Sequence, residues 1–326
     1  MKYVDVGGVS LSAVGLGAWQ FGSREWGYGT GYAEEEAGAI TRRALDLGIN
    51  LIDTAEAYAF GESERIVGRA IAGRRDEAFI ATKLFPVLPI VPVVHERAIA
   101  SASRLGVQLI DLYQLHWPNP VVSLTSTMRG MRDLQSIGLV RHVGVSNFSL
   151  EQWQKAETAL GSPVLSNQVQ YSLAERKPDR DLVAWAQAND RLIIAYSPLA
   201  QGLLSGRYDR ANVPGGVRAG NALFLPDNLD RAEELLTALR QVAADHDATP
   251  AQVALAWLIR RPNVVAIPGA SSVSQLEANA AAADLDLSDE EDRALTEASD
   301  RFHPRTGPGA YPALAKARIQ RLSKRA

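Results

Sequence analysis

The chain has 326 residues, of which 46% are hydrophobic and 22% charged, and its formal net charge is −3. This composition supports a large core and excludes a disordered chain, and the charge excludes a globally basic nucleic-acid-binding protein. The absence of cysteine excludes a disulfide scaffold, a cysteine-ligated metal centre and a thiol nucleophile. No apolar run approaches ~18 residues, which excludes a membrane-spanning helix. Asp5, Gly7 and Gly8 stand where a signal peptide needs apolar residues, so we expect a cytoplasmic protein.

Short apolar segments alternate along the chain with longer amphipathic ones. The predicted strands are residues 14–19, 50–53, 79–83, 109–116, 140–146, 164–168, 192–196 and 264–267. The predicted helices are residues 34–47, 63–72, 93–105, 123–137, 150–160, 180–188, 231–244 and 272–283. Such alternation is typical of crossover units with parallel strands, and several strands are apolar on both faces. The sequence therefore predicts an α/β protein, with a single (β/α)8 TIM barrel over residues 1–300.

Further segments extend the predicted barrel. Residues 2–12 alternate around two glycines and predict an N-terminal β-hairpin that caps one end. Thr249-Pro250 predicts a helix over residues 251–261, and Ser288 followed by acidic residues starts another, because such residues favour helix N-termini. Residues 205–228 are rich in proline and glycine and too long for a simple connection, which indicates a functional loop.

Polar residues end several predicted strands. In a βα barrel the reacting groups lie at the carboxyl ends of the strands. Taken singly, each such residue is more often a turn, cap or solvated residue than a catalyst. An acid, a lysine and a histidine that converge on one rim favour a catalytic site instead, because burying them is costly unless they pair. The residues at these ends are Asp53, Lys83, His116, Ser146, Asn147, Gln168, Tyr196 and Ser197.

Tyr58 lies five residues after Asp53 and is a candidate general acid. The ordinary pKa of tyrosine is about 10. A lysine ammonium beside it would lower that pKa, and a carboxylate would keep the lysine charged. Asp53, Lys83 and Tyr58 supply this arrangement, and His116 could orient a carbonyl oxygen. The five histidines are scattered and predict no metal site, and a serine nucleophile would lack its Gly-x-Ser-x-Gly elbow.

The order of these motifs resembles the aldo-keto reductase family. The resemblance covers about residues 1–300. It is carried by GINLIDTAEAY at 48–58, GESE at 61–64, ATK at 81–83, DLYQLHWP at 111–118, GVSNF at 144–148, NQVQYS at 167–172, YSPL at 196–199 and IPGA at 267–270. The nearest branch resembles bacterial reductases close to the potassium-channel β subunits. The resemblance implies a barrel that binds a nicotinamide cofactor without a Rossmann domain, and no Gly-x-Gly-x-x-Gly follows a predicted strand.

The resemblance also implies residue roles. Tyr58 protonates a carbonyl oxygen while the carbon receives a hydride, Lys83 lowers the pKa of Tyr58, Asp53 holds Lys83, and His116 orients the carbonyl. Ser146, Asn147 and Gln168 hold the carboxamide, and Tyr196 stacks on the nicotinamide ring. The implied cofactor site is Gly17, Ala18, Trp19, Asp53, Ser146, Asn147, Gln168, Tyr196, Ser197, Pro198, Leu199, Gln201, Gly202, Leu203, Arg207, Arg218, Gly269, Ser271, Ser272, Gln275 and Asn279. The expected substrate wall is Trp19, Tyr58, Phe85, His116 and Trp117, each of which could equally be core packing.

The segment expected to meet the adenosine phosphate predicts NADPH, with weaker use of NADH. Many bacterial relatives resemble Ile-Pro-Gly-Ala-Arg here, whereas this chain has Ser271 in place of the arginine. Ser271 and Ser272 open a predicted helix whose N-terminal N–H groups attract phosphate, and the NADP-dependent channel branch has a similar Ser-Ser. Arg218, with Arg207 as second candidate, would supply a cation. Ala278 replaces the usual glutamate, which predicts a weaker adenine contact.

A second function stays open at this point. A protein similar to the channel β subunits could act mainly as a redox-sensing, cofactor-binding regulatory partner of another protein. Multi-turnover oxidation of NADPH with a test aldehyde would distinguish it from an enzyme. For the enzyme we expect a small-molecule carbonyl substrate and no nucleic-acid or membrane partner, and the oligomeric state is open.

The C-terminal residues 301–326 form a basic tail with seven lysines and arginines and no acid. One interpretation is a solvated end. The other is a short helix whose Leu314, Ile319 and Leu322 dock on the barrel rim, so that the tail covers the substrate mouth or an acidic neighbour.

Overall fold

The computed structural model describes residues 1–29 and 32–316, and eight parallel strands form its barrel. Neighbours in the barrel follow chain order, and the barrel closes where its first and last strands meet. There Gly15 N–H donates to Ala266 O at 2.7 Å and Gly17 N–H donates to Pro268 O at 3.1 Å. A Cβ on Gly17 would lie 2.7 Å from the carbonyl oxygen of Ile267, so only glycine permits this approach. The strands are β3 (Leu16–Gly17), β4 (Leu51–Asp53), β5 (Phe79–Leu84), β6 (Ile110–Leu115), β7 (Val140–Ser146), β8 (Ser166–Gln170), β9 (Leu192–Tyr196) and β10 (Val264–Ala266).

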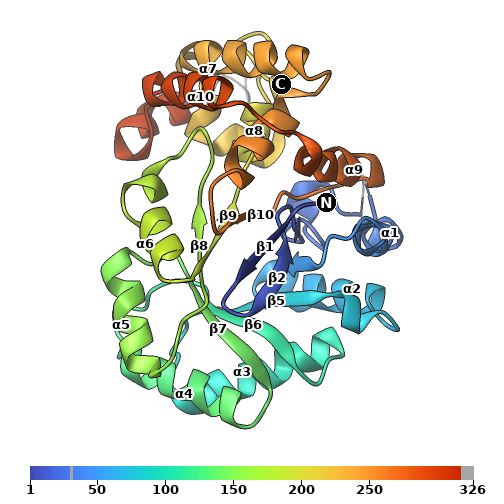
Figure 1. The fold of residues 1–326 in the computed structure, drawn as a ribbon, viewed down its shortest axis with the longest axis vertical. Coiled ribbons are helices and arrows are strands. Elements are labelled where there is room, and N and C mark those ends of the chain that lie inside the picture. The colour runs from blue at the N-terminus through green and yellow to red at the C-terminus, as the bar shows by residue number, and fades with distance from the viewer. Residues whose placement is uncertain (30–31, 317–326) are drawn as a thin grey trace.

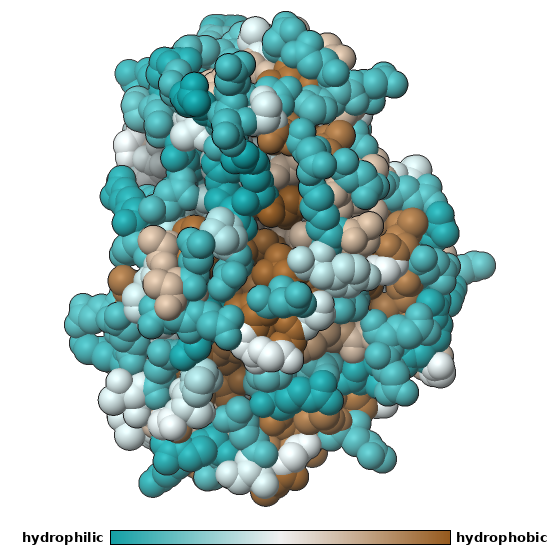
Figure 2. All heavy atoms as spheres, viewed as in Figure 1, coloured by the Kyte–Doolittle hydropathy of each residue, from teal (hydrophilic) through white to brown (hydrophobic). Residues whose placement is uncertain are grey.

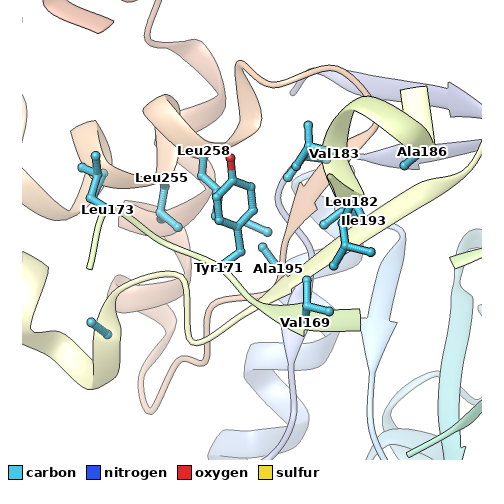
Figure 3. Packing of buried hydrophobic residues seen from close by; sticks show 14 of the residues in the cluster. Val169, Tyr171, Leu173, Leu182, Val183, Ala186, Ile193, Ala195, Leu255 and Leu258 are labelled. Carbon is cyan, nitrogen blue, oxygen red and sulfur yellow. The ribbon is translucent and has the colours of Figure 1, made fainter. Parts of the chain in front are cut away.

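Helices surround the barrel, as Figure 1 shows, and confirm the predicted (β/α)8 architecture. Apolar side chains from strands and helices interlock between the two layers. Figure 3 shows Val169 of β8 and Ile193 of β9 beside Leu182 and Val183 of the helix that covers them. No helix in the described part of the chain is long and apolar enough to cross a membrane. The helices are α1 (Glu34–Asp46), α2 (Glu62–Ala70), α3 (Val91–Leu105), α4 (Leu124–Ser136), α5 (Leu150–Leu160), α6 (Leu182–Ala188), α7 (Pro226–Asp245), α8 (Pro250–Ile259), α9 (Val273–Ala281) and α10 (Asp289–Arg301).

The predicted N-terminal hairpin closes one end of the barrel. Strands β1 (Tyr3–Val6) and β2 (Val9–Ser12) pair antiparallel, and they cross the near end of the barrel in Figure 1. Buried residues of the hairpin pack with Leu51 and Phe79, which begin strands β4 and β5. In the same view, apolar residues show in the centre of this face and polar residues cover most of the remainder (Figure 2). The amino ends of the strands are therefore plugged, and the opposite end is left for chemistry.

The long segment before α7 is more ordered than the predicted loop over residues 205–228. Two short 3-10 turns, Gly216–Gly220 and Ala222–Phe224, precede α7, which begins at Pro226 rather than at the predicted residue 231. Proline suits the first turn of a helix because its φ is preset and its missing N–H is not needed there. Pro226 is therefore the first residue of α7 and not part of the loop that the sequence predicted.

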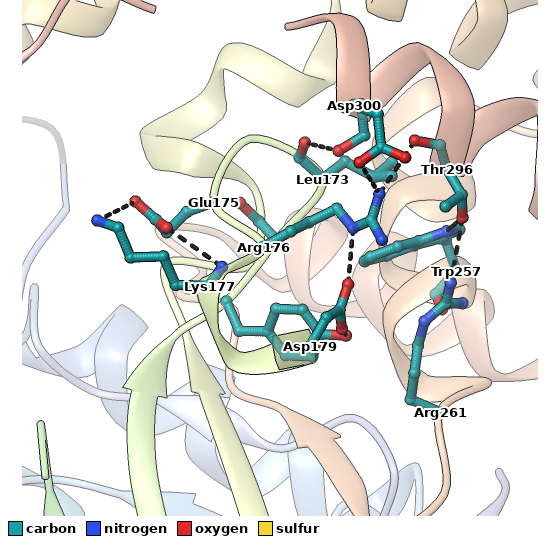
Figure 4. A network of polar contacts seen from close by, with 12 residues as sticks. Leu173, Glu175, Arg176, Lys177, Asp179, Trp257, Arg261, Thr296 and Asp300 are labelled. Carbon is teal, nitrogen blue, oxygen red and sulfur yellow. Dashed lines mark hydrogen bonds and ion pairs between the residues drawn. The ribbon is translucent and has the colours of Figure 1, made fainter. Parts of the chain in front are cut away.

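Helix α10 lies outside the barrel repeat and is joined to it by a polar network (Figure 4). Arg176, in the segment after β8, donates through Nη1 to Asp300 at 2.8 Å. Nε1 of Trp257 in α8 donates to Oγ1 of Thr296 in α10 at 3.0 Å. The guanidinium of Arg261 lies 3.7 Å from the centre of the Trp257 ring, a cation–π contact. These contacts make the C-terminal helix part of the barrel unit.

The described part of the basic tail docks beside the start of α7. Nδ2 of Asn228 donates to Arg305 O at 2.9 Å, and Arg305 N–H donates to Oδ1 of Asn228 at 2.8 Å. Ala310 is buried and Leu314 is partly buried. The other two apolar residues of the predicted tail helix, at positions 319 and 322, lie outside the described residues.

Candidate active site

A buried lysine organises the carboxyl end of the barrel. Nζ of Lys83, in β5, donates to Oδ1 of Asp53, in β4, at 2.6 Å. The same Nζ donates to the carbonyl oxygen of Thr54 at 2.8 Å and to Oη of Tyr58 at 3.1 Å. These bonds use all three hydrogens of the ammonium. Because the Tyr58 oxygen accepts one of them, the hydroxyl hydrogen of Tyr58 is left to donate elsewhere.

The electrostatics keep Lys83 charged and Tyr58 neutral. Burial opposes the charged form of Lys83, but the attraction and hydrogen bonds of Asp53 and Tyr58 outweigh it and raise the Lys83 pKa. For Tyr58, burial raises the pKa, and the opposing effect of Lys83 is too small to reverse this direction. Lys83 therefore acts on the Tyr58 pKa in the predicted direction, but the net pKa is raised, because burial disfavours a phenolate more strongly than one ammonium favours it. Tyr58 carries its proton at neutral pH.

His116, directly after β6, stands beside Tyr58 in an aromatic setting. The two rings are edge-on, with centroids 5.9 Å apart, and Phe85 and Trp117 flank His116 at 6.1 and 6.2 Å. Burial, with a smaller effect of Lys83, lowers the pKa of His116 to about 3. Its Nδ1 is buried and has no hydrogen-bond partner within residues 1–29 and 32–316. A neutral imidazole of this kind can donate one N–H to a ligand oxygen.

The lowered pKa of His116 predicts a loss of stability in acid. An unfolded histidine has a pKa of about 6.5. Between pH 6.5 and about 3, residue 116 is therefore protonated in the unfolded chain and neutral in the folded protein. This contribution to stability is complete above the unfolded pKa and is lost as the pH falls, by up to about 1.4 kcal/mol per pH unit. We expect the free energy of unfolding in urea to fall more steeply with acid in the wild type than in His116→Gln. The exposed His303 supplies the control, His303→Gln, and equal slopes in wild type and His116→Gln would contradict the prediction.

Polar side chains at the ends of β7, β8 and β9 extend the site. Nε2 of Gln168 donates to Oδ2 of Asp53 at 2.7 Å, and Oγ of Ser146 donates to Gln168 O at 2.8 Å. Oη of Tyr196 donates to Oδ1 of Asn147 at 2.9 Å. Asn147 has a φ of 63°, a left-handed conformation that asparagine tolerates better than most residues other than glycine. The four side chains form one connected amide and hydroxyl surface next to the lysine.

These groups open into a cavity of about 730 Å³. Ligand sites typically measure ~300–1,000 Å³. Most of the residues predicted from the sequence line it, and the tertiary structure brings them together from all parts of the barrel. They are Gly17, Trp19, Asp53, Tyr58, His116, Trp117, Ser146, Asn147, Gln168, Tyr196, Ser197, Pro198, Leu199, Gln201, Gly202, Arg207, Arg218, Gly269, Ser271, Gln275 and Asn279.

Five predicted site residues lie outside this lining. Ala18 and Leu203 are buried in the core, Lys83 lies behind Tyr58, and Phe85 stands beside His116. Ser272 is the N-cap of α9, and its hydroxyl accepts the N–H of Gln275 at 3.2 Å. Its oxygen accepts this bond, which leaves the hydroxyl hydrogen free to donate.

The cavity lining also contains residues that the sequence interpretation did not select. The ring of Trp26 lies 5.1 Å from that of Trp19, and the Arg218 guanidinium lies 4.9 Å from the Trp26 ring centre. Nε of Arg218 donates to Gln201 O at 2.8 Å, so segments after β3 and β9 meet over the cavity. An aromatic residue in a glycine-rich stretch was the available signal for Trp26. No sequence signal placed the N-terminus of α8 at the cavity, because its distance from the cavity depends on how elements far apart in the sequence pack. The added residues are Gln20, Trp26, Ala57, Ser205, Tyr208, Thr249, Ala251, Ile267 and Pro268, and Ala278, expected at the adenine contact, also lines the cavity.

The segment after β9 is suited to anions. Ser197, Ala200 and Gln201 have φ values of 49°, 48° and 56°, and Gly202 follows at 98°. Left-handed residues in a turn gather backbone N–H groups into concavities that bind phosphates. With Arg207 and the Arg218 described above, the same loop supplies cations to the cavity. The donor set thus fits a ligand with an amide at one part and phosphates at another.

The comparisons with known proteins agree with this site. Residues 13–300 match the model of the aldo/keto reductase family, and the chain belongs to that family. It is accordingly an oxidoreductase, and the resemblance inferred from its motifs is confirmed. An uncharacterized oxidoreductase of Mycobacterium tuberculosis is 56% identical over 305 residues, which cover 93% of this chain and 94% of that protein.

Two further relatives carry more specific descriptions. An NADH-specific methylglyoxal reductase of Escherichia coli is 30% identical over 317 residues, covering 89% of this chain and 95% of that protein. The crystal structure of an aldo/keto reductase from Klebsiella pneumoniae in complex with NADP and acetate is 33% identical. It covers 94% of this chain and 97% of its own, with a TM-score of 0.72.

Proposed function

We propose that the protein reduces aldehydes or ketones to alcohols with NADPH, and that Tyr58 is the proton donor. The observation that carries the proposal is the bond from Lys83 to Tyr58 at 3.1 Å. It leaves the Tyr58 proton directed to a ligand in the cavity, next to a neutral His116. The E. coli and K. pneumoniae relatives support carbonyl reduction and a nicotinamide cofactor as the class of reaction.

When bound, the nicotinamide supplies the hydride that the carbonyl carbon receives. Tyr58 donates its proton to the carbonyl oxygen as negative charge develops there. The ammonium of Lys83 stabilises the phenolate that remains, and Asp53 keeps that ammonium charged. Neutral His116 donates an N–H to the same oxygen and holds the carbonyl in place.

The cavity residues fit the two ends of the cofactor. Ser146, Asn147 and Gln168 would hold the carboxamide, and Tyr196 would stack on the nicotinamide ring. The strained loop of residues 197–203 would hold the pyrophosphate through backbone N–H groups. Gln275 and Asn279, which line the cavity from α9, would meet the adenosine.

The preference for NADPH rests mainly on Arg218. The N–H and hydroxyl of Ser271 both donate to Oε1 of Gln275 at 3.0 Å, whereas Ser272 accepts the capping bond of α9 and can still donate its hydroxyl hydrogen. Arg218 uses Nε on Gln201 O, and guanidinium has five N–H donors in all. Because the E. coli relative is NADH-specific, the affinities of this protein for NADPH and NADH should be titrated directly.

The test is a carbonyl panel assayed separately with NADPH and NADH. Multiple turnovers with NADPH and an aldehyde, faster than with NADH, are expected. A single turnover, or binding without turnover, would instead favour the redox-sensing regulatory partner. The cytoplasmic location stays a prediction.

Deletion of residues 312–326 should raise KM for the carbonyl substrate. The described tail is anchored by Asn228 and Arg305 at the start of α7, which directly follows the loop that carries Arg218. The deletion leaves this anchor in place and removes only the chain beyond it, which we expect to cover the substrate mouth. KM, kcat and the mass in solution should be measured together. Unchanged kinetics with unchanged oligomer size would indicate that the end is simply solvated.

A further inference from the structure

Glu56 and Arg97 form an ion pair beside the site that the proposed chemistry does not use. Glu56 lies in the turn between β4 and Tyr58, and Arg97 lies in α3. Nε of Arg97 donates to Oε2 of Glu56 at 2.9 Å, and Nη2 lies 2.8 Å from Oε1. The side chain of Arg97 is 27% exposed and that of Glu56 is 9% exposed. A two-pronged contact of this kind fixes the relative position of its partners, which an exposed single contact does not.

The pair holds the backbone of Phe85 on both sides. Phe85 N–H donates to Oε1 of Glu56 at 2.5 Å, and Phe85 O accepts from Nη1 of Arg97 at 2.8 Å. Phe85 is the first residue after β5, and 39% of it is exposed. Because one ion pair engages both its N–H and its C=O, this residue has little freedom to turn. The place of its ring against His116 therefore depends on the pair.

We propose that Glu56 and Arg97 are positioning residues for the substrate. Phe85 lies just outside the cavity lining, but its ring packs 6.1 Å from that of His116, which lines the cavity. By fixing Phe85, the pair positions the His116 side of the wall, against which the bulk of a large carbonyl compound would lie. The inference rests on the proposed reductase function. It adds the expectation that the pair governs discrimination between large and small substrates.

The proton-donating groups are held separately from this pair. Lys83 bonds to Asp53, Thr54 and Tyr58, and none of these three bonds involves Glu56 or Arg97. Loss of the pair should therefore change KM for bulky substrates and leave kcat largely intact. A general weakening of the fold would not separate the two constants in this way.

The test compares an aromatic aldehyde, 4-nitrobenzaldehyde, with propanal in wild type and Arg97→Met. Misplacing a positioning group by ~1 Å can cost ~100-fold. Since only an outer wall moves here, we expect about a tenfold rise in KM for the aromatic aldehyde. KM for propanal and both kcat values should change little. Amide hydrogen exchange at Phe85, which needs no turnover, should become faster, and Arg97→Lys should give an intermediate result.

A second ion pair at the opposite end of the barrel supplies a matched control. Nε of Arg191 donates to Oε1 of Glu157 at 2.5 Å, and the same carboxylate accepts Val164 N–H at 3.0 Å. Nη1 of Arg191 donates to Asn189 O at 2.6 Å, and the two side chains are 15% and 20% exposed. Arg191→Met thus removes the same kind of backbone contact just before β8 and β9, away from the site. It should leave KM for both aldehydes unchanged.

A double-substitution cycle tests whether Arg97 acts through Phe85. Phe85→Ala alone should raise KM for the aromatic aldehyde, and Arg97→Met should add little in that background, because coupled residues are not additive. Four results would each overturn the inference. They are equal KM increases for both aldehydes in Arg97→Met, a selective KM increase for the aromatic aldehyde in Arg191→Met, full additivity of Phe85→Ala and Arg97→Met, and unchanged amide exchange at Phe85. Wild-type protein that turns over neither aldehyde would count against the proposed function alone. Hydrogen exchange at Phe85 would then still test whether Glu56 and Arg97 hold the Phe85 backbone.

Discussion

Replacing Tyr58 by phenylalanine should lower kcat by at least ~100-fold, the usual contribution of a general acid. The ring stays, so the wall beside His116 is kept. Lys83 loses the bond at 3.1 Å and retains its bonds to Asp53 and Thr54. Cofactor affinity should therefore be nearly unchanged. Steady-state kinetics with an aldehyde and fluorescence titration of NADPH measure the two quantities.

Tyr113, in β6, offers the matched control. It is fully buried, and its hydroxyl has no hydrogen-bond partner in the part of the chain that the structure describes. Tyr113→Phe removes a buried phenolic oxygen just as Tyr58→Phe does, but away from the cavity. It should leave kcat unchanged. Turnover of Tyr58→Phe at the wild-type rate would rule out the role assigned to Tyr58.

Replacing Arg218 by alanine should weaken NADPH binding about ten- to a hundredfold and leave NADH binding nearly alone. A charge-assisted contact to the extra phosphate is worth ~1.5–3 kcal/mol, which corresponds to this range. The dissociation constants of both cofactors, titrated on wild type and variant, give the answer. Equal affinity of the wild type for NADPH and NADH would show that the assignment is wrong.

Arg210, in the same loop, distinguishes a phosphate contact from a general loss of charge. It is exposed and pairs with Asp230, so Arg210→Ala should change neither affinity. Arg218 also contacts Trp26 and Gln201 across the cavity. Equal weakening of NADPH and NADH in Arg218→Ala would therefore mean that this bridge matters and that the phosphate is bound elsewhere.

Most elements of the barrel could be predicted because their signals are local. Thr249-Pro250 and Ser288 start helices as expected, and both helices have a capping box. One local signal was misread. Pro226 was interpreted as loop punctuation and is the first residue of α7. Proline is common both in loops and in the first turn of a helix, and the neighbouring elements decide between the two.

The sequence by itself determined the barrel and the candidate catalytic residues Asp53, Lys83, Tyr58 and His116. Hydrophobic periodicity and polar residues that end apolar segments are local features, which can be recognised without the structure. Only the tertiary structure decided the direction of the Tyr58 pKa, because burial is set by atoms from many distant segments. It also decided that Trp26 meets Arg218 and that Glu56 and Arg97 hold Phe85. Such contacts join loops far apart in the sequence, and they form only after the strands have brought those loops to one rim.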